Sequence, residues 1–326
     1  MKNLIMDSNR LSSSTTESGP PKITIVTPSY NQGAFLERTI QSVLGQNYLN
    51  LEYIIIDGGS ADNSVDIIRK YESHLAYWVS ESDNGQSEAI NKGLKRATGD
   101  IIAWLNSDDW YEPGVLKRVS EEIDLGQDRY VVMGDVRMLY PDGSERLFIQ
   151  PDIKFNRLLH HNKLYQLGGK TGHPSQPSIF WHRSVMEAVG FLDEDLHKAM
   201  DTDYWLRMLQ AGFSFNRIPE VWSNYPIHEA SKSGQGWEAF FDEWSRVEQK
   251  AKAALCPKRR FETQLWWRRE KTSVLLARRH RDAQRVCRQA HSLPPLQRFK
   301  RMMRAFSIAP WRINNLSALK PGPPSV

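Results

Sequence analysis

The sequence predicts an α/β protein with a mostly parallel, Rossmann-like sheet flanked by helices. From residue 22 onward, short apolar runs alternate with amphipathic segments of helical spacing. The apolar runs are nearly continuous, which is typical of strands buried on both faces of a parallel sheet. Alternating strands and helices favour right-handed crossovers with helices on both faces. With 326 residues, 40% hydrophobic content and 11 Trp, the chain has ample material for a core.

The first half of the chain is expected to form strands and helices in turn. Residues 23–27 form an apolar run that ends in turn-forming residues, which predicts a strand. Asn31 can cap a helix with apolar side chains at helical spacing from Leu36 to Leu44, and Gly45 stops it. The next expected elements are strands at 51–56, 77–79 and 101–105, and helices at about 64–71 and from Ser87.

The second half continues this pattern and then changes character. Strands are expected at 130–136 and 178–182, and a helix begins near Asp201. Beyond Gly236 the chain reads as helical and basic to its end, with a break at Pro294-Pro295.

The net charge of +5 combines two regions of opposite charge. Residues 250–326 contain 19 Lys and Arg against 3 Asp and Glu, whereas the rest contains 24 against 35. Cys256 and Cys287 have no CxxC partner, which argues against a disulfide framework or a cysteine-rich zinc site and fits a reducing compartment. Neither an apolar run long enough to span a membrane nor a signal-peptide pattern is found. We therefore expect a cytoplasmic or peripheral protein.

Polar segments directly follow the expected strands, at 28–31, 57–60, 82–86 and 106–109. In open α/β sheets, ligands bind beyond the carboxyl ends of the strands, so these segments are expected to line a site. Neither GxGxxG nor GxxxxGK[ST] follows the first strand, which argues against a dinucleotide fold and a P-loop NTPase.

Adjacent carboxylates, Asp108 and Asp109, directly follow a buried strand. Paired acids at such a position can hold a hard divalent cation, which in turn can neutralise a diphosphate. The alternative is a solvated loop that caps the helix near Pro113.

Six short motifs occur in order, most of them at strand ends. They are Thr27-Pro28-Ser29-Tyr30-Asn31, Asp57-Gly58-Gly59-Ser60-Ala61-Asp62, Ser82-Asp83-Asn84-Gly85, Ala89-Ile90-Asn91-Lys92-Gly93, Ala97-Thr98-Gly99-Asp100 and Leu105-Asn106-Ser107-Asp108-Asp109. Over roughly residues 22–235 the chain resembles the family 2 glycosyltransferases of bacterial polysaccharide biosynthesis. That family has the GT-A fold and uses nucleoside-diphosphate sugars.

The resemblance implies a nucleotide-sugar donor, usually UDP-linked. Asp57 would accept a hydrogen bond from the base, since a carboxylate is a strong acceptor for an imide, and Asp83 lies in the loop that closes on the nucleoside. The alternatives are an Asx turn for Asp57 and a solvated helix face for Asn91 and Lys92. The implied donor-binding residues are Thr27, Pro28, Tyr30, Asp57, Asp83, Gln86, Asn91, Lys92, Asn106 and Ser107.

The resemblance also implies a divalent metal, Mn²⁺ or Mg²⁺, on the donor diphosphate. The family's DxD element corresponds to residues 106–109, with Asn106 where the first acid often stands. Asp108, with Asp109 or His228, would hold the ion. His228 matches a position where related enzymes often have a histidine, and a neutral imidazole can complete such a site. An ordinary surface histidine is the alternative.

One segment of the second half resembles the part of the family that supplies the catalytic base. Asp201 aligns with the base, although Met200 stands where a Glu commonly precedes it. Asp203 lies about 200° further around a helix, so at most one of the two can point into the cleft. We favour Asp201; the other acid would stabilise the positive helix N-terminus.

His173 and Gln176 lie in a Pro-rich segment that some members of the family place before the strand under the acceptor site. They are candidates for contacts with the acceptor or the donor sugar, with a structural role as the alternative.

The predicted function is metal-assisted, inverting transfer of a sugar to a hydroxyl of a carbohydrate or lipid-linked acceptor. A nucleotidyltransferase would need a basic phosphate-gripping loop, which residues 28–33 lack. A non-catalytic nucleotide-sugar-binding or scaffold protein is the other alternative. The sugar, the acceptor and the oligomeric state are not determined by the sequence.

The basic C-terminal region lies outside the resemblance. Aromatic and apolar residues stand among clustered cations at 266–269, 278–281 and 299–304, which favours an anionic membrane surface as partner, on the inner face of the cell membrane. A packed helical appendage is the alternative, and nucleic acid is disfavoured because no recognised motif is found. The predicted organisation is a disordered leader (1–21), a GT-A domain (22–235) and a helical basic extension (236–326).

Overall fold

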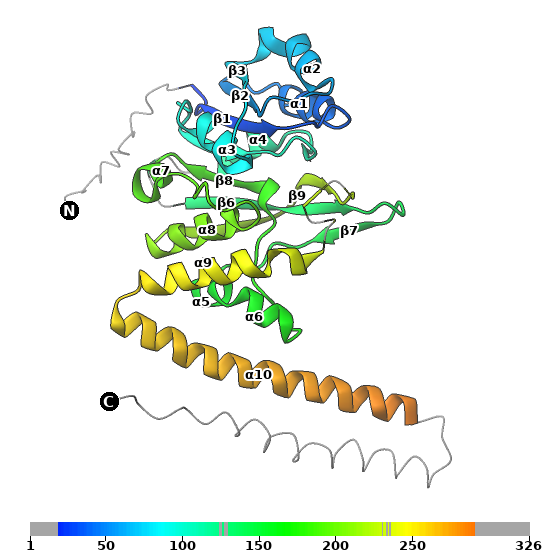
Figure 1. Ribbon diagram of the computed structural model, residues 1–326, viewed down its shortest axis with the longest axis vertical. Helices are drawn as coiled ribbons and strands as arrows, with labels where there is room; N and C mark the ends of the chain where they lie inside the picture. The colour runs from blue at the N-terminus through cyan, green and yellow to red at the C-terminus, as the bar shows by residue number, and fades with distance from the viewer. Residues whose placement is uncertain are drawn as a thin grey trace, which may run out of the picture. The chain divides into compact units, whose positions relative to one another are not determined.

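The computed structural model describes residues 19–123, 126, 130–229, 231–232, 234 and 236–290 (Figure 1). The chain divides into two compact units. The first consists of Met1–Asp152 with Pro174–Glu243, and the second of Ile153–His173 with Trp244–Val326. The second unit thus takes in residues 153–173 as well as the C-terminal helices, whereas the expected boundary at 235/236 stays a prediction.

A single sheet forms the centre of the first unit. In the described residues it has nine strands, ordered β3-β2-β1-β4-β8-β6-β9-β5, with β7 paired to β6. They are β1 (Ile23–Ser29), β2 (Leu51–Asp57), β3 (Tyr77–Ser80), β4 (Ile101–Trp104), β5 (Trp110–Tyr111), β6 (Tyr130–Leu139), β7 (Glu145–Phe148), β8 (Ile179–His182) and β9 (Ser214–Pro226).

The four strands from β3 to β4 are all parallel, and every residue of β1 and β4 is buried. The continuous apolar runs therefore marked the doubly covered strands correctly, and the predicted α/β class is confirmed. Beyond β4 the sheet is mixed, because β8 runs antiparallel to β4 and β6 while β6 and β9 are parallel. The strands β5, β7 and β9 were not predicted, because they are short or largely exposed and carry no continuous apolar run.

Helices cover this sheet in the first unit (Figure 1). They are α1 (Leu36–Leu44), α2 (Ser64–Tyr71), α3 (Gln86–Leu94), α4 (Val115–Glu122), α7 (Ser184–Val189) and α8 (Met200–Gln210). Helix α3 packs closely on β1, because a Cβ at Gly93 would lie 2.3 Å from a methyl carbon of Val26. A side chain larger than hydrogen at position 93 would push the helix off the strand.

Asn31 does not cap α1, contrary to expectation. The helix begins at Leu36 with Phe35 as its N-cap residue, and Asn31 has a left-handed backbone (φ 52°). Its amide donates to Ser60 Oγ (2.8 Å) and its Oδ1 accepts from the amide of Ala61 (2.8 Å). Asn31 therefore joins the loop after β1 to the loop after β2.

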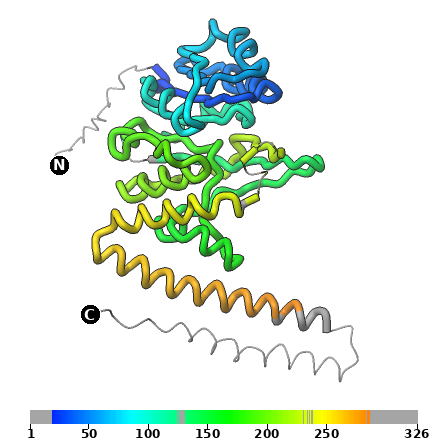
Figure 2. Tube along the Cα trace, in the orientation of Figure 1, coloured from blue at the N-terminus to red at the C-terminus, as the bar shows by residue number. Residues whose placement is uncertain are grey.

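The second unit is helical in its described part. It contains α5 (Phe155–Leu159), α6 (His161–Gln166), most of α9 (Phe241–Ala253) and α10 (Pro257–Ala290). Helix α10 is one long helix (Figure 2). His160 links these helices, since its Nδ1 lies 3.0 Å from Glu248 Oε1 and its ring stacks near Trp266. The helices expected after residue 236 are thus present up to 290. The leader up to residue 18 and the cluster at 299–304 lie outside the described residues.

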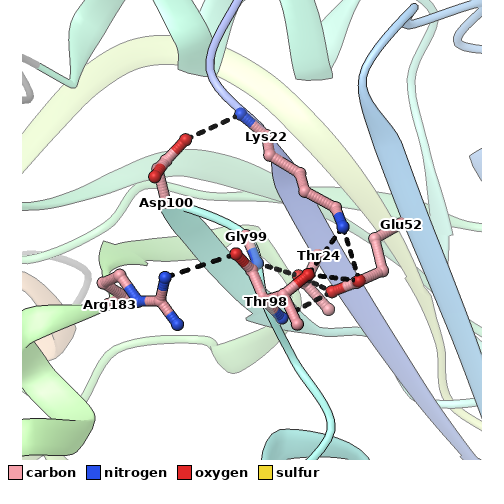
Figure 3. Close-up of polar contacts among 7 residues, drawn as sticks. All are labelled: Lys22, Thr24, Glu52, Thr98, Gly99, Asp100 and Arg183. Carbon is pink, nitrogen blue, oxygen red and sulfur yellow. Dashed lines mark hydrogen bonds and ion pairs between the residues drawn. The ribbon is translucent and has the colours of Figure 1, made fainter.

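A buried carboxylate holds together the amino-terminal ends of β1 and β2 (Figure 3). Glu52 accepts hydrogen bonds from Lys22 Nζ (2.7 Å), from Thr24 Oγ1 (2.6 Å) and from both the amide (2.7 Å) and hydroxyl (2.6 Å) of Thr98. The amide of Gly99 donates to Thr24 Oγ1 (2.9 Å), which ties the segment before β4 to the same group. Part of the fifth of the six motifs, 97–100, therefore serves the fold at the amino-terminal edge of the strands. This edge lies opposite the carboxyl ends where a ligand is expected.

The ionisation of Glu52 depends on these bonds. Burial by itself would raise the pKa of Glu52, but the bonds from Lys22, Thr24 and Thr98 outweigh it and lower the pKa from 4.5 to about 2. A carboxyl group with a lowered pKa stabilises the native state above its unfolded pKa, and this contribution is lost as the pH falls through the native pKa.

We predict that Glu52→Gln lowers the free energy of unfolding by about 2 kcal/mol at pH 7, because charge-assisted bonds to a buried group are lost. The difference from wild type is expected to shrink as the pH falls from about 4.5 toward 2. Urea unfolding at several pH values measures it, with Glu72→Gln on the surface as control. A difference that is independent of pH would contradict the role of the charge.

Candidate functional site

The carboxyl ends of β1, β2 and β4 bring polar loops to one edge of the sheet in the first unit. Ser29 lies opposite Asp57 in the β1–β2 register, and Val26 lies opposite Trp104 at the end of β4. Because these strands are parallel, the loops that follow them meet at this edge. The segments that were expected to line a site therefore lie together.

Asp57 organises the loop after β2. Its side chain is fully buried, and its Oδ2 accepts from the amides of Gly59 (3.2 Å) and Ser60 (2.9 Å) and from the hydroxyl of Ser80 (2.7 Å). Its Oδ1 accepts from the hydroxyl of Ser60 (2.5 Å). Three of these four bonds go to Oδ2 and one goes to Oδ1, so the buried carboxylate is already largely engaged within its own loop and by β3. The geometry thus favours the Asx-turn role, and base contact stays a prediction.

Asp83 faces the same loop and is half-buried. Its Oδ1 accepts from the amide of Gly85 (2.8 Å), and a Cβ at Gly58 would lie 2.7 Å from its Oδ2. Burial raises the pKa of Asp83, and the bond from Gly85 offsets this only in part. Glycine at position 58 therefore lets the loops after β2 and β3 approach each other beside a carboxyl group.

The first loop contributes one exposed ring. Tyr30 is 61% exposed, whereas Thr27 and Pro28 are buried in β1, and Thr27 Oγ1 lies 3.1 Å from the hydroxyl of Tyr53. Of these three predicted donor-binding residues, Tyr30 is the one whose side chain is available to a ligand.

A chain of hydrogen-bonded amides runs along the edge. Gln86 Nε2 donates to Asn106 Oδ1 (2.7 Å), and Asn106 Nδ2 donates to Asp109 Oδ2 (3.1 Å) and to Gln176 Oε1 (3.3 Å). Gln176 Nε2 in turn donates to the carbonyl of Trp104 (2.8 Å). Four predicted site residues from three separate segments are thus connected.

Asp109 is a fully buried acid. Burial raises its pKa well above the usual value, and the charge of Asp108 raises it further. Its Oδ1 is buried without a hydrogen-bond partner in the described structure. Asp109 therefore holds Asn106 in place through Oδ2, and its role as a metal ligand stays a prediction.

Asp108 pairs with His228 across two loops. Its Oδ2 lies 3.1 Å from His228 Nε2, and the imidazole stacks on Phe35 at 4.5 Å between ring centres. Both side chains keep a small exposed fraction, 16% for Asp108 and 19% for His228. A carboxylate oxygen is a ligand that suits both Mn²⁺ and Mg²⁺, and an imidazole nitrogen suits a transition ion such as Mn²⁺ better than Mg²⁺. The described residues contain no cluster of three His, Cys, Asp or Glu ligands, so a cation here would take further ligands from substrate or water.

The two acids of α8 differ in their surroundings. Asp203 is buried and its Oδ2 accepts from Arg207 Nε (2.7 Å), which fixes it within the fold. Asp201 is half-buried in the first turn, and its Oδ1 accepts from the amide (2.6 Å) and hydroxyl (3.2 Å) of Thr202. This geometry favours Asp201 over Asp203 for contact with a substrate.

Stacked indoles connect α8 to β4. The rings of Trp104 and Trp205 are parallel within 3° at 5.3 Å, and both side chains are buried. Trp104 precedes Asn106 by two residues and Trp205 follows Asp201 by four. The stack therefore fixes the helix that carries the candidate base against the strand that leads into the loop of the candidate metal ligand.

Three of the predicted donor-binding residues have partners within the fold. Asn91 is buried and binds both the carbonyl (3.0 Å) and the amide (2.9 Å) of Leu192. Lys92 forms ion pairs with Glu81 (3.0 Å) and Glu88 (3.2 Å). Ser107 is buried and its carbonyl accepts from Thr39 Oγ1 (2.8 Å), and its role in donor binding stays a prediction.

His173 belongs to the second unit. Its ring lies 5.1 Å from that of His161 and 6.1 Å from that of Trp244. Gln176, three residues later, belongs to the first unit and to the amide chain described above.

Lys232 is a site residue that the sequence reasoning missed. Its ammonium donates to Gln86 Oε1 (2.5 Å) and to the carbonyl of His197. The available signal was a basic residue four positions after His228, which is too weak to be read without the fold.

Solved structures with the same fold include TarS of S. aureus. It matches with a TM-score of 0.55 and 17% identity over 74% of this chain and 42% of that chain. The structure of TarS residues 1–349 in complex with UDP-GlcNAc matches with a TM-score of 0.57 and 16% identity, over 74% of this chain and 70% of that chain. The predicted GT-A fold is thereby confirmed.

The sequence comparisons identify the family. The model of glycosyl transferase family 2 matches residues 24–190. An uncharacterized glycosyltransferase of Mycobacterium tuberculosis is 33% identical over 189 residues, which cover 57% of this chain and 68% of the relative. EpsJ, an uncharacterized glycosyltransferase of Bacillus subtilis, is 25% identical over 246 residues, or 72% and 70% of the two chains. The chain belongs to glycosyl transferase family 2 and is a transferase.

Proposed function

We propose that the protein transfers a sugar from a UDP-linked donor to a hydroxyl group of a carbohydrate or lipid-linked acceptor. The observation that carries the proposal is the Asp108–His228 pair at 3.1 Å, beside the loops of Asp57 and Asp83 at the carboxyl edge of the sheet. The structure of TarS with UDP-GlcNAc supports a UDP-linked donor for this fold. Family membership speaks against the nucleotidyltransferase and scaffold alternatives.

Asp108 and His228 are the residues that would hold Mn²⁺ or Mg²⁺. When bound, the ion would neutralise charge on the donor diphosphate as it leaves. The residues fit this assignment, because they offer one carboxylate and one imidazole with exposed atoms, and because Asp109 places a further buried oxygen next to them. Asn106 is engaged by Gln86, which leaves it the role of a positioning residue.

Asp201 would act as the general base. Its carboxylate would accept the proton of the acceptor hydroxyl while the hydroxyl oxygen attacks the anomeric carbon. The bond between that carbon and the diphosphate oxygen breaks on the opposite face, which inverts the configuration. The Trp104–Trp205 stack would preserve the position of Asp201 relative to the metal-binding loop.

UDP with Mn²⁺ is expected to raise the melting temperature of the protein more than UDP alone, because a ligand that binds only the native state stabilises it. Asp108→Asn is expected to remove the increment that depends on Mn²⁺ and to keep the metal-free effect of UDP. Thermal unfolding with and without EDTA measures both, and Asp66→Asn, on an exposed helix face, serves as control. An unchanged Mn²⁺ increment in Asp108→Asn would remove Asp108 from this role.

Asp201→Asn is expected to lower the rate of transfer by at least ~10²-fold, the range of general-base catalysis, while donor binding survives. Initial rates of nucleoside-diphosphate release in the presence of acceptor measure the first effect, and UDP binding measures the second. Asp195→Asn, at an exposed position, is the matched control. Undiminished turnover in Asp201→Asn would exclude it as the base.

We further propose that α10 associates with an anionic membrane surface. Phe261, Leu265 and Leu276 are 64%, 37% and 58% exposed, and at 100° per residue they lie within about 60° of one another on the helix. The exposed cations Arg268, Arg269 and Arg279 share or border this face. Apolar side chains flanked by arginines suit the headgroup boundary, where each cation adds about 1 kcal/mol. No helix in the described ranges has the length and apolarity to cross a bilayer.

Vesicles test this proposal. The full chain is expected to sediment with vesicles that contain phosphatidylglycerol and less with pure phosphatidylcholine, and high salt is expected to weaken the binding. Replacing Phe261, Leu265 and Leu276 together by Ser is expected to reduce the bound fraction, whereas Leu49→Ser, which changes a 93% exposed residue of the first unit, leaves it unchanged. Equal binding of the triple variant would contradict the assignment to this face.

A further inference from the structure

Lys232 places a positive charge at the functional edge of the first unit. Its ammonium donates to Gln86 Oε1 (2.5 Å) and to the carbonyl of His197, so three chain segments meet at this group. Burial lowers the pKa of Lys232 to about 8, and the carboxylates of Glu243, Asp201 and Asp108 counteract the effect. The side chain therefore remains largely protonated at neutral pH. Its ammonium interacts electrostatically with both the candidate base, Asp201, and the candidate metal ligand, Asp108.

A short turn sets Lys232 relative to His228. Ser231 Oγ donates to the carbonyl of His228 (2.7 Å) and accepts from the amides of His228 (3.3 Å) and Gly234 (3.1 Å). A Cβ at Gly234 would lie 2.1 Å from the carbonyl oxygen of His228, so the turn requires glycine there. The imidazole that pairs with Asp108 and the ammonium that binds Gln86 are thus presented by one turn after β9.

The N-terminus of α3 lies at the same place. Gln86 is the first residue of α3 and Gly85 (φ 125°) is its N-cap residue; the amide of Gly85 donates to Asp83 Oδ1 (2.8 Å), and the amide of Asn84 donates to Glu88 Oε2 (2.8 Å). A helix N-terminus carries a partial positive charge and binds anions through its amides. Lys232 donates to the side chain of Gln86 at this helix end, so an anionic ligand bound there would lie close to its ammonium.

We propose that Lys232 binds the diphosphate of the nucleotide-sugar donor. This inference rests on the proposed function and adds a protein cation to the metal-binding pair Asp108–His228. A lysine ammonium binds phosphate as a point charge through up to three donated hydrogen bonds. Gln86 and the carbonyl of His197 hold the ammonium in the substrate-free protein, and Lys232 is accordingly a binding residue of the donor rather than of the acceptor.

Binding of UDP and of uridine, measured in EDTA on the full chain, separates the phosphate contribution from the nucleoside contribution. Lys232→Met is expected to weaken UDP binding at least ~10-fold and to leave uridine binding unchanged, since a charge-assisted bond to the diphosphate is lost. Lys232→Arg is expected to retain part of the preference for UDP over uridine. Lys95→Met, which removes a 56% exposed lysine at the other end of α3, is the matched control.

Each outcome has one meaning. Wild-type protein that binds neither UDP nor uridine, both in EDTA and with Mn²⁺, would overturn the UDP-donor proposal and this inference with it. Wild-type protein that prefers UDP, with the same preference in Lys232→Met, would overturn the role of Lys232 alone. A lower melting temperature of Lys232→Met with unchanged preference would make Lys232 a structural tether of the turn, and Lys232→Arg would then also keep the full preference.

Discussion

The stacking of Trp104 on Trp205 is the contact on which the functional edge depends. A strand end and a helix start, 101 residues apart in sequence, are fixed by two buried indoles whose planes differ by 3°. Trp181 and Tyr204 pack around this pair at 5.3–6.2 Å, so the geometry is maintained from several sides. Aromatic clusters of this kind contribute both large buried area and a preferred orientation. The stack therefore also fixes the relative positions of the nearby carboxylates, Asp108 after Trp104 and Asp201 before Trp205.

The two ends of the parallel strands serve different purposes. At the amino ends, Glu52 accepts bonds from Lys22, Thr24 and Thr98 and so holds β1, β2 and the segment before β4 together. At the carboxyl ends, titratable groups are closely spaced and incompletely paired: Asp109 has a buried oxygen without a hydrogen-bond partner among the described residues, and Lys232 lies among carboxylates. Such arrangements cost stability and are typical of sites that meet a ligand. The hydrogen bonds at the amino ends of the strands therefore offset part of the cost in stability at the carboxyl ends.

Much of the fold could be predicted because strands buried on both faces must be apolar throughout. The runs that became β1, β2 and β4 carried this signal, and α2 was predicted with its observed limits. Strand β9 was missed because most of its 13 residues are at least partly exposed, and its pairing with β6 and β5 involves distant segments. The capping role expected for Asn31 failed because its side chain serves a contact between loops rather than a helix end.

The sequence by itself determined which chemical groups follow the strands, and hence the fold class, the family resemblance and the location of a site. The tertiary structure decided which of these groups are available. Arg207 engages Asp203 and leaves Asp201 as the more accessible acid, and Lys232 reaches Gln86 across 146 residues. The physical reason is that strand formation depends on local apolar pattern, whereas the charge state and accessibility of a side chain depend on neighbours that only the folded chain brings together.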